Sequence, residues 1–271
     1  MVVGRGAQWS ACAILRLLLG CLALTHAVAS AGVAGAEPIH EARAAYAEGR
    51  FVDAARIGET LGTSQGLALA AESLTIHAHF IASKDEKEAL FQRAAELARQ
   101  AVRADPGNAD AHLQLAHAIG RHAQTVGSLE AANRGYAAGI REATEAALQL
   151  DPEMAAAHLS LGLWHAEIIG AVGSFLAYVT YGARARDAVA SFERALELAP
   201  DSKAASLECA LGLLALDENK YRERARRLLK RAIEIPTMDA YDRLLDDQAL
   251  ERLGALDSST TDDARTVGRD E

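Results

Sequence analysis

Histidine is the side chain most often used to bind metals and to move protons near neutral pH, and this sequence contains nine of them. His77 and His79 are two residues apart in a stretch expected to be helical, where such side chains diverge around the helix. His112, His117 and His122 recur at every fifth residue, which also spreads them around a helix. Neither group has the i, i+4 spacing that directs two imidazoles at one ion. The sequence therefore predicts no metal site.

The other residue types that carry chemistry suggest no catalytic arrangement. Gly127, Gly170 and Gly173 stand in expected turns between helices, not in a phosphate-binding loop. Carboxylates are spread along helix faces, as solvated charge on amphipathic helices normally is. Cys209 lies at an expected helix-packing position and should be a buried, unreactive thiol. We therefore expect neither an enzyme nor a bound cofactor.

Proline organises the elements that hold these side chains. Each of four prolines follows the end of an amphipathic helical pattern, as in Ala-Leu-Gln-Leu-Asp before Pro152, and starts a turn. These prolines are Pro106, Pro152, Pro200 and Pro236. Small residues recur at matching distances before and after the first three, namely Ala101, Ala147 and Ala195 before them and Ala116, Gly162 and Ala210 after them. Small residues let neighbouring helices approach closely, so the sequence predicts an all-α stack of helical hairpins.

This pattern resembles the tetratricopeptide repeat (TPR) family. Residues 155–200 carry Leu161-Gly162 on the first helix and Ala188, Phe192, Ala195 and Pro200 on the second, in TPR spacing. The first hairpin has the family's turn as Gly49-x-Phe51-x-x-Ala54. The resemblance covers about residues 38–236 and implies a right-handed TPR-like solenoid. It says little about function, since one fold serves many functions.

The central repeats are longer than those of the family. Pro106, Pro152 and Pro200 are further apart than the usual period of about 34 residues. The additional residues fall between the first and second helix, where Ser128 and Ser174 are expected to be N-caps. Both arms should therefore be longer, giving elongated central hairpins. This layout also resembles periplasmic TPR proteins associated with TRAP-type transporters, which implies a solute-binding protein as partner.

The first helices of a TPR stack line its concave face. Their periodicity places nine residues there: Leu113, His117 and Arg121, then Leu159, Leu163 and Glu167, then Leu207, Leu211 and Leu214. A clamp for a peptide carboxylate would need several basic residues, and only Arg121 could serve. The alternatives are an open apolar groove that binds a hydrophobic segment or small ligand, and a core in which the tall hairpins bury these leucines.

Residues 170–182 hold Phe175, Tyr178 and Tyr181 in a chain with few aromatic residues. A spacing of three places them on one helical face. They form a contact patch at a hairpin tip, a lid over the groove, or a packing contact with the equivalent tip around Leu129 and Tyr136.

The first 36 residues have the character of a targeting segment. Arg5 and Arg16 supply positive charge before an apolar run too short to span a bilayer, and a small-x-small site ends at Ala36. Plain secretion would leave Glu37 at the N-terminus. The alternative is a lipoprotein acylated at Cys21, which is the one case in which we expect a membrane partner.

Charge and periodicity complete the domain plan. The net charge of −9 disfavours nucleic-acid binding, because phosphate backbones would be repelled. Residues 38–256 form the repeat domain, whose last helix, 239–256, should cover the open end of the stack. Residues 257–271 are polar and expected to be disordered.

The leading hypothesis is an exported TPR-type protein that docks a protein partner in the cell envelope. The alternative is a ligand-binding accessory of a solute transporter, and an enzyme comes last.

Overall fold

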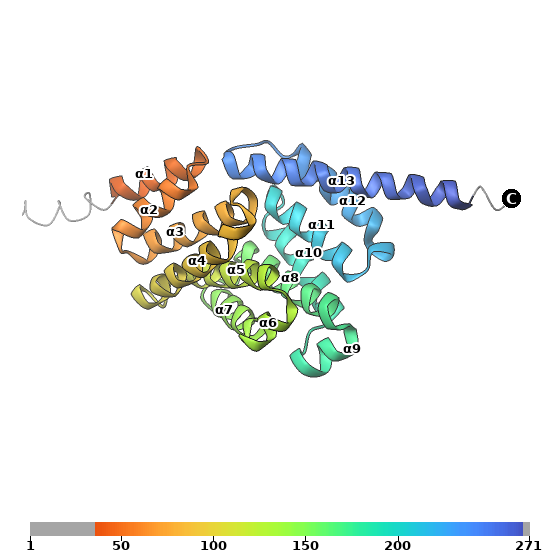
Figure 1. Cartoon of the computed structure of the whole chain (residues 1–271), viewed down its shortest axis with the longest axis horizontal. Coiled ribbons are helices and arrows are strands. Elements are labelled where there is room, and N and C mark those ends of the chain that lie inside the picture. The colour runs from red at the N-terminus through yellow and green to blue at the C-terminus, as the bar shows by residue number, and fades with distance from the viewer. Residues whose placement is uncertain (1–35, 268–271) are drawn as a thin grey trace, which may run out of the picture.

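The computed structural model describes residues 36–267, and side chains for residues 39–258. The expected targeting segment, with Arg5, Arg16 and Cys21, lies outside the described residues apart from Ala36 at its end. Within the described part every regular element is a helix (Figure 1). The elements are α1 (Ala36–Ala47), α2 (Phe51–Leu61), α3 (Ser64–Ile76), the π-helical turn η1 (His77–Ile81), α4 (Lys84–Ala104), α5 (Ala109–Val126), α6 (Ser128–Asn133), α7 (Tyr136–Leu150), α8 (Ala155–Val172), α9 (Ser174–Leu176), the π-helical turn η2 (Ala177–Tyr181), α10 (Ala185–Leu198), α11 (Lys203–Leu216), α12 (Glu218–Glu234) and α13 (Ala240–Val267). None of the described helices is long and apolar enough to cross a membrane.

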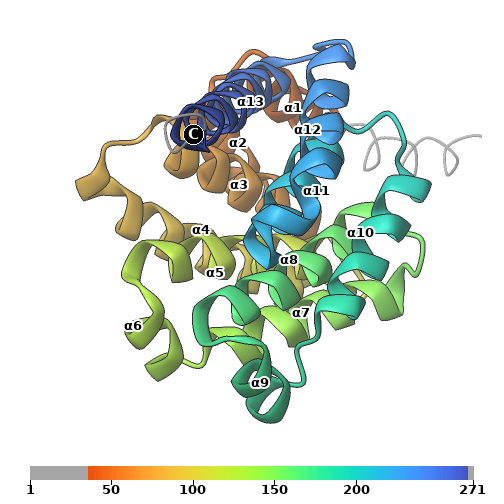
Figure 2. The same cartoon turned by 90° about the vertical axis from the view of Figure 1, so that its right-hand side faces the viewer.

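These helices form a stack of antiparallel hairpins, so the expected all-α, TPR-like solenoid is confirmed. The hairpins pair α1 with α2, α3 with α4, α5 with α7, α8 with α10 and α11 with α12. The first helices of successive hairpins also touch, since α5 contacts both α3 and α8, and α8 contacts α11. Figure 2 shows the resulting curve, with the first helices on its inner side.

Equivalent residues make equivalent contacts in two repeats. His112 Nε2 lies 3.0 Å from the carbonyl oxygen of Pro106, and His158 Nε2 lies 2.9 Å from that of Pro152. Each imidazole therefore closes the turn that precedes its own helix. A capping box begins α4, with Glu86 accepting from the backbone N–H of Ser83 at 3.1 Å.

Two glycines and one aromatic ring set the spacing between hairpins. Phe192 on α10 is fully buried, and Gly162 on α8 and Gly212 on α11 face its ring. A Cβ at either glycine would come within 2.5 Å of that ring, so only glycine fits.

Ala195 is also fully buried, and burial raises the pKa of the nearby Cys209 thiol to about 12. The expectation that Cys209 is buried agrees with the structure.

The central hairpins differ from expectation in their second arms. The first arms, α5 and α8, are long, but each second arm is broken into a short tip and a longer helix. Ser128 and Ser174 are not N-caps. They begin the tip segments, the cap positions belong to Gly127 and Gly173, and neither serine makes a capping hydrogen bond. The second arms are broken because Gly135 and Gly182, with positive φ angles of 68° and 72°, end the tip segments and turn the chain.

Helix α13 does more than cover the last hairpin. Its first residue, Ala240, packs with Phe51 and Ile76 of the first hairpins, and the Tyr241 ring centroid lies 6.1 Å from that of Phe80. Its following turns pack on α11 and α12 (Figure 1). It therefore spans from the start of the stack to its end.

A buried lysine holds α13 in place. Lys203 at the start of α11 donates to the carbonyl oxygens of Ala232 at 3.0 Å and Ile235 at 2.8 Å. Its ammonium group also pairs with Asp246 of α13. Helix α13 continues to Val267, although the residues from 257 on were expected to be disordered. Residues 257–267 contain neither glycine nor proline, so nothing in the backbone ends the helix at 256.

A candidate binding cavity on the concave side

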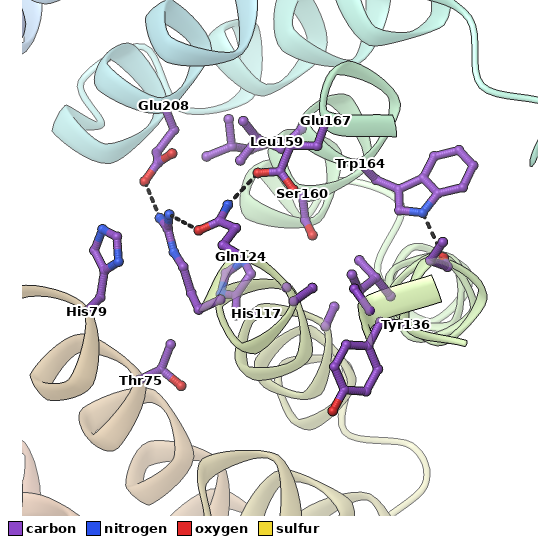
Figure 3. A pocket seen from close by; sticks show the side chains of 18 of the residues that line it. Thr75, His79, His117, Gln124, Tyr136, Leu159, Ser160, Trp164, Glu167 and Glu208 are labelled. Carbon is purple, nitrogen blue, oxygen red and sulfur yellow. Dashed lines mark hydrogen bonds and ion pairs between the residues drawn. The ribbon is translucent and has the colours of Figure 1, made fainter. Parts of the chain in front are cut away.

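The concave side of the stack contains a cavity of about 800 Å³. Its walls come from α3 and η1, from α5, α7 and α8, from α11, and from Tyr241 of α13. Figure 3 shows these side chains converging from several helices. Because α13 joins the two ends of the stack, it closes one side of this space.

Most of the wall is apolar. Leu113, Leu159 and Leu163 line it, as the periodicity predicted for an inner face. The periodicity did not single out five further apolar residues that also line it: Ile76, Phe80, Ile140, Trp164 and Ile168. Alanines such as Ala116, Ala123 and Ala156 face the same space. Their short side chains leave the volume that larger residues would occupy.

The expected inner face is present on α5 and α8 but not on α11. His117, Arg121 and Glu167 line the cavity together with the three leucines. Leu207, Leu211 and Leu214 instead belong to the core between α11, α12 and α13. On α11 the residues that face the cavity are Ala204, Glu208 and Ala215. Helix α11 is apolar on nearly every side, so hydrophobic periodicity does not indicate which face turns inward. Its one acidic residue, Glu208, lies on the inner face.

A polar network crosses the cavity between three first helices (Figure 3). Arg121 on α5 donates to Glu208 on α11 at 2.6 Å, and also to Gln124 at 3.3 Å. Gln124 in turn donates to Glu167 on α8 at 2.5 Å. The Arg121 guanidinium thus already has a carboxylate partner. A ligand carboxylate would have to compete with Glu208 for this guanidinium.

Both histidines in the cavity wall are neutral at physiological pH. Burial lowers the pKa of His79 to about 3, and the positive charge of Arg121 contributes in the same direction. Burial and the same guanidinium lower the pKa of His117 to about 4. Across the described residues, no group of three His, Cys, Asp or Glu side chains is placed to hold a metal ion. The histidines therefore act in the cavity as uncharged polar groups.

One end of the cavity is rich in hydrogen-bond acceptors. Glu72 on α3 accepts a hydrogen bond from the Tyr46 hydroxyl at 3.1 Å, and Gln114 Nε2 on α5 donates to Asp110 at 3.0 Å. Burial raises the pKa of Glu72 to about 7, and the charge of Asp110 adds to this effect. Sequence reasoning missed these residues. The available signal was that Glu72 is the one Asp, Glu, Lys or Arg between residues 60 and 83, and a lone charge in an apolar helix is often functional or paired.

The aromatic residues expected at a hairpin tip do not share one face. Phe175 on α9 is 77% exposed and Tyr178 on η2 is 50% exposed, beside exposed Leu176 and Val179. Tyr181, the last residue of η2, instead lines the cavity. The tip is therefore an exposed apolar patch of Phe175, Leu176, Tyr178 and Val179, and we call it the α9 tip.

A Gly-x-Ser-x-Gly pattern occurs at residues 62–66, but its surroundings are not those of a catalytic serine. Such a serine stands on a turn from strand to helix, whereas this turn joins α2 to α3. Thr63 caps α3 by accepting from the N–H of Gly66 at 3.2 Å. Ser64 is buried, and its hydroxyl accepts a hydrogen bond from Asn108 at 2.8 Å. The pattern therefore serves helix capping and packing.

Comparisons with known proteins agree with this architecture. The sequence model of one protein family, described as "Regulator of microtubule dynamics protein 1-3", matches residues 65–257. A crystal structure of a thermophilic TPR protein from Thermus thermophilus superposes with a TM-score of 0.54 at 21% sequence identity, covering 80% of this chain and 98% of that one. At this identity the likeness concerns the fold alone. No curated protein matches the sequence.

Proposed function

The chain belongs to the family described as regulator of microtubule dynamics protein 1–3, and we propose that it is a non-catalytic binding protein whose cavity holds a ligand with an apolar body. The observation that carries this proposal is the cavity of about 800 Å³ on the concave side. Small-molecule sites typically have about 300–1,000 Å³, with apolar walls and a few convergent polar groups. This cavity has all three features.

The alternative, that the hairpins bury the inner leucines as ordinary core, applies to Leu113 and Leu159, which are only 3% and 8% exposed. Leu163 is half-buried and lines the cavity, although part of it packs near Gly212. Alanines in the walls and the glycines of α5 and α8 keep the space free of side chains. An interior with such a large void would normally collapse or fill with larger residues, since protein cores are close-packed. An open cavity is therefore the better interpretation.

An occluding substitution tests this proposal. Ala123 on α5 faces the cavity, so Ala123→Trp should fill part of it and abolish the binding of an environment-sensitive hydrophobic dye. Ala138 on α7 is exposed and outside the cavity wall, which makes Ala138→Trp the matched control. The dye should bind the wild type and the control equally. Absence of dye binding to the wild type would refute the proposal.

A second candidate function, docking of a protein partner, is favoured by the α9 tip. Its apolar side chains are exposed on a projecting segment (Figure 2), and exposed aromatic groups often mark contact sites. We propose an exported location in the cell envelope for this docking, on the basis of residues 1–36. A solute-binding protein of a TRAP-type transporter is one partner that would suit it. Phe175→Ser should remove a co-purifying envelope partner without changing dye binding, and retention of the partner would argue against the tip.

A further inference from the structure

The acceptor-rich end of the cavity contains an unsatisfied group. Gln114 is 5% exposed and lines the cavity, yet its Oε1 has no hydrogen-bond partner among the described residues. The orientation of this amide is settled by its neighbour. Asp110 can only accept a hydrogen bond when ionised, so the amide nitrogen must face Asp110 and the oxygen must face away from it. A buried acceptor without a donor is unfavourable, and such groups commonly mark a missing partner.

The groups around Gln114 are acceptors as well. Glu72 on α3 receives one hydrogen bond, from Tyr46, and a carboxylate can accept several more. Helices α3 and α5 pack against each other, and the charge of Asp110 acts directly on Glu72. We call Glu72, Asp110 and Gln114 the acceptor end of the cavity. A partner that satisfies it must bring donors.

The charge of the whole cavity points to the same conclusion. Among the described residues that line it, Arg121 is the one lysine or arginine, against four carboxylates: Glu72, Asp110, Glu167 and Glu208. Arg121 is already paired with Glu208, and His79 and His117 are uncharged. Phosphate or carboxylate ligands would therefore be repelled, while a cation would be attracted.

We propose that the acceptor end binds the ammonium group of an apolar amine. This proposal rests on the proposed function, because the hydrocarbon body of the amine lies along Leu113, Leu159 and Leu163. An ammonium group carries three donors and no acceptor. It supplies hydrogen-bond donors to Glu72 and to the Gln114 oxygen, and its positive charge offsets the surplus of carboxylates in the cavity wall. The source is a free amine that enters the cavity whole.

Three probes of equal chain length test the chemistry: octylammonium, octan-1-ol and octanoate. Each is titrated by calorimetry into the full chain at pH 8, above the pKa of Glu72. Octylammonium should bind at least about tenfold more tightly than octan-1-ol, the difference expected for one charge-assisted hydrogen bond. Octanoate should bind more weakly than either. Equal affinity for octylammonium and octan-1-ol would overturn the proposal.

Two variants assign the effect to the acceptor end. Gln114→Leu and Glu72→Gln should each remove most of the preference for octylammonium over octan-1-ol. Circular dichroism and a cooperative thermal melt check that each variant is folded, and two independent variants guard against a failure of either. An unchanged preference in both would refute the assignment.

Two further outcomes separate this proposal from related ones. If the wild type binds the dye but shows no preference for the amine, the amine site fails while the cavity function stands. If neither the dye nor octylammonium binds, the proposed function itself fails. An acetylated apolar peptide with one lysine tests the other source of an ammonium group. Binding of that peptide without binding of octylammonium would overturn the free-amine proposal in favour of a protein partner.

Discussion

Replacing the partly buried Glu72 by glutamine should change how the stability of the protein depends on pH. Burial raises the pKa of this carboxyl from 4.5 to about 7, with the charges of Asp110 and Asp239 contributing, while the hydrogen bond from Tyr46 opposes the shift. The folded state therefore keeps its proton up to about pH 7, whereas the unfolded chain releases it near pH 4.5. Because the folded state binds more protons in this window, Glu72 lowers stability as pH rises through it.

The magnitude follows from the size of the shift. Each pKa unit corresponds to about 1.4 kcal/mol, so at pH 8 the ionisable group costs about 3 kcal/mol relative to its neutral form. At pH 5 the same calculation gives a cost to folding stability of about 1 kcal/mol. Glu72→Gln cannot ionise, and its amide oxygen can still accept from Tyr46. The free energy of unfolding of the variant, relative to that of the wild type, should therefore rise by about 2 kcal/mol from pH 5 to pH 8.

Urea unfolding of both proteins at pH 5 and pH 8 measures this gain. The variant must be compared with the wild type at each pH because His79 and His117 change the stability with pH in the opposite direction. Their pKa values are lowered in the folded state, so their contribution to stability is lost as pH falls below the unfolded value of 6.5. Subtracting the wild type from the variant removes this common contribution. Parallel stability profiles for the two proteins would show that the pKa of the Glu72 carboxyl is not raised in the folded state.

Four other substitutions test the packing and the cavity wall. Gly162→Ala places a Cβ 2.5 Å from the ring of Phe192 and should lower the free energy of unfolding by about 1–3 kcal/mol, whereas Gly254→Ala meets nothing within 4 Å and should raise it by up to about 1 kcal/mol. Lys203→Met removes a buried ion pair and should cost about 3 kcal/mol, with faster proteolysis of α13 as the second readout. Leu163→Gln should cost only about 1 kcal/mol by thermal melting, because the side chain borders the cavity, yet it should weaken dye binding.

The hairpins were predictable because each is a local pattern. A proline after an amphipathic helix and a small residue at a fixed distance describe one repeat completely, and His112 and His158 repeat the same contact in two of them. The broken second arms were missed for an equally local reason. Gly127 and Gly173 mark the visible turns, while Gly135 and Gly182 stand inside what looks like continuing helix, where a single glycine is tolerated at modest cost.

The inner face of α5 was predictable because this helix is amphipathic, and its polar side chains His117 and Arg121 mark the face that turns inward. Helix α8 is apolar nearly all round, and its inner face, with Glu167, was predictable only from its register with α5 in the repeat. On α11 the predicted leucines pack outward against α12 and α13, because hydrophobic periodicity cannot orient a helix that is apolar all round. Glu72 and Gln114 depend on the meeting of α3 and α5, which no single segment encodes.

The return of α13 explains why a cavity persists in this fold. A curved stack leaves its inner face open to solvent, and apolar side chains there would favour a tighter curve that buries them. Here Ala240 and Tyr241 contact the first hairpins while Asp246 is held by Lys203 at the last, so the two ends of the curve are tied together by one rigid helix. The Arg121–Glu208 pair further fixes α5 relative to α11 across the space. Because the ends cannot approach, the walls cannot close, and the cavity keeps a volume that a ligand, rather than the chain itself, can fill.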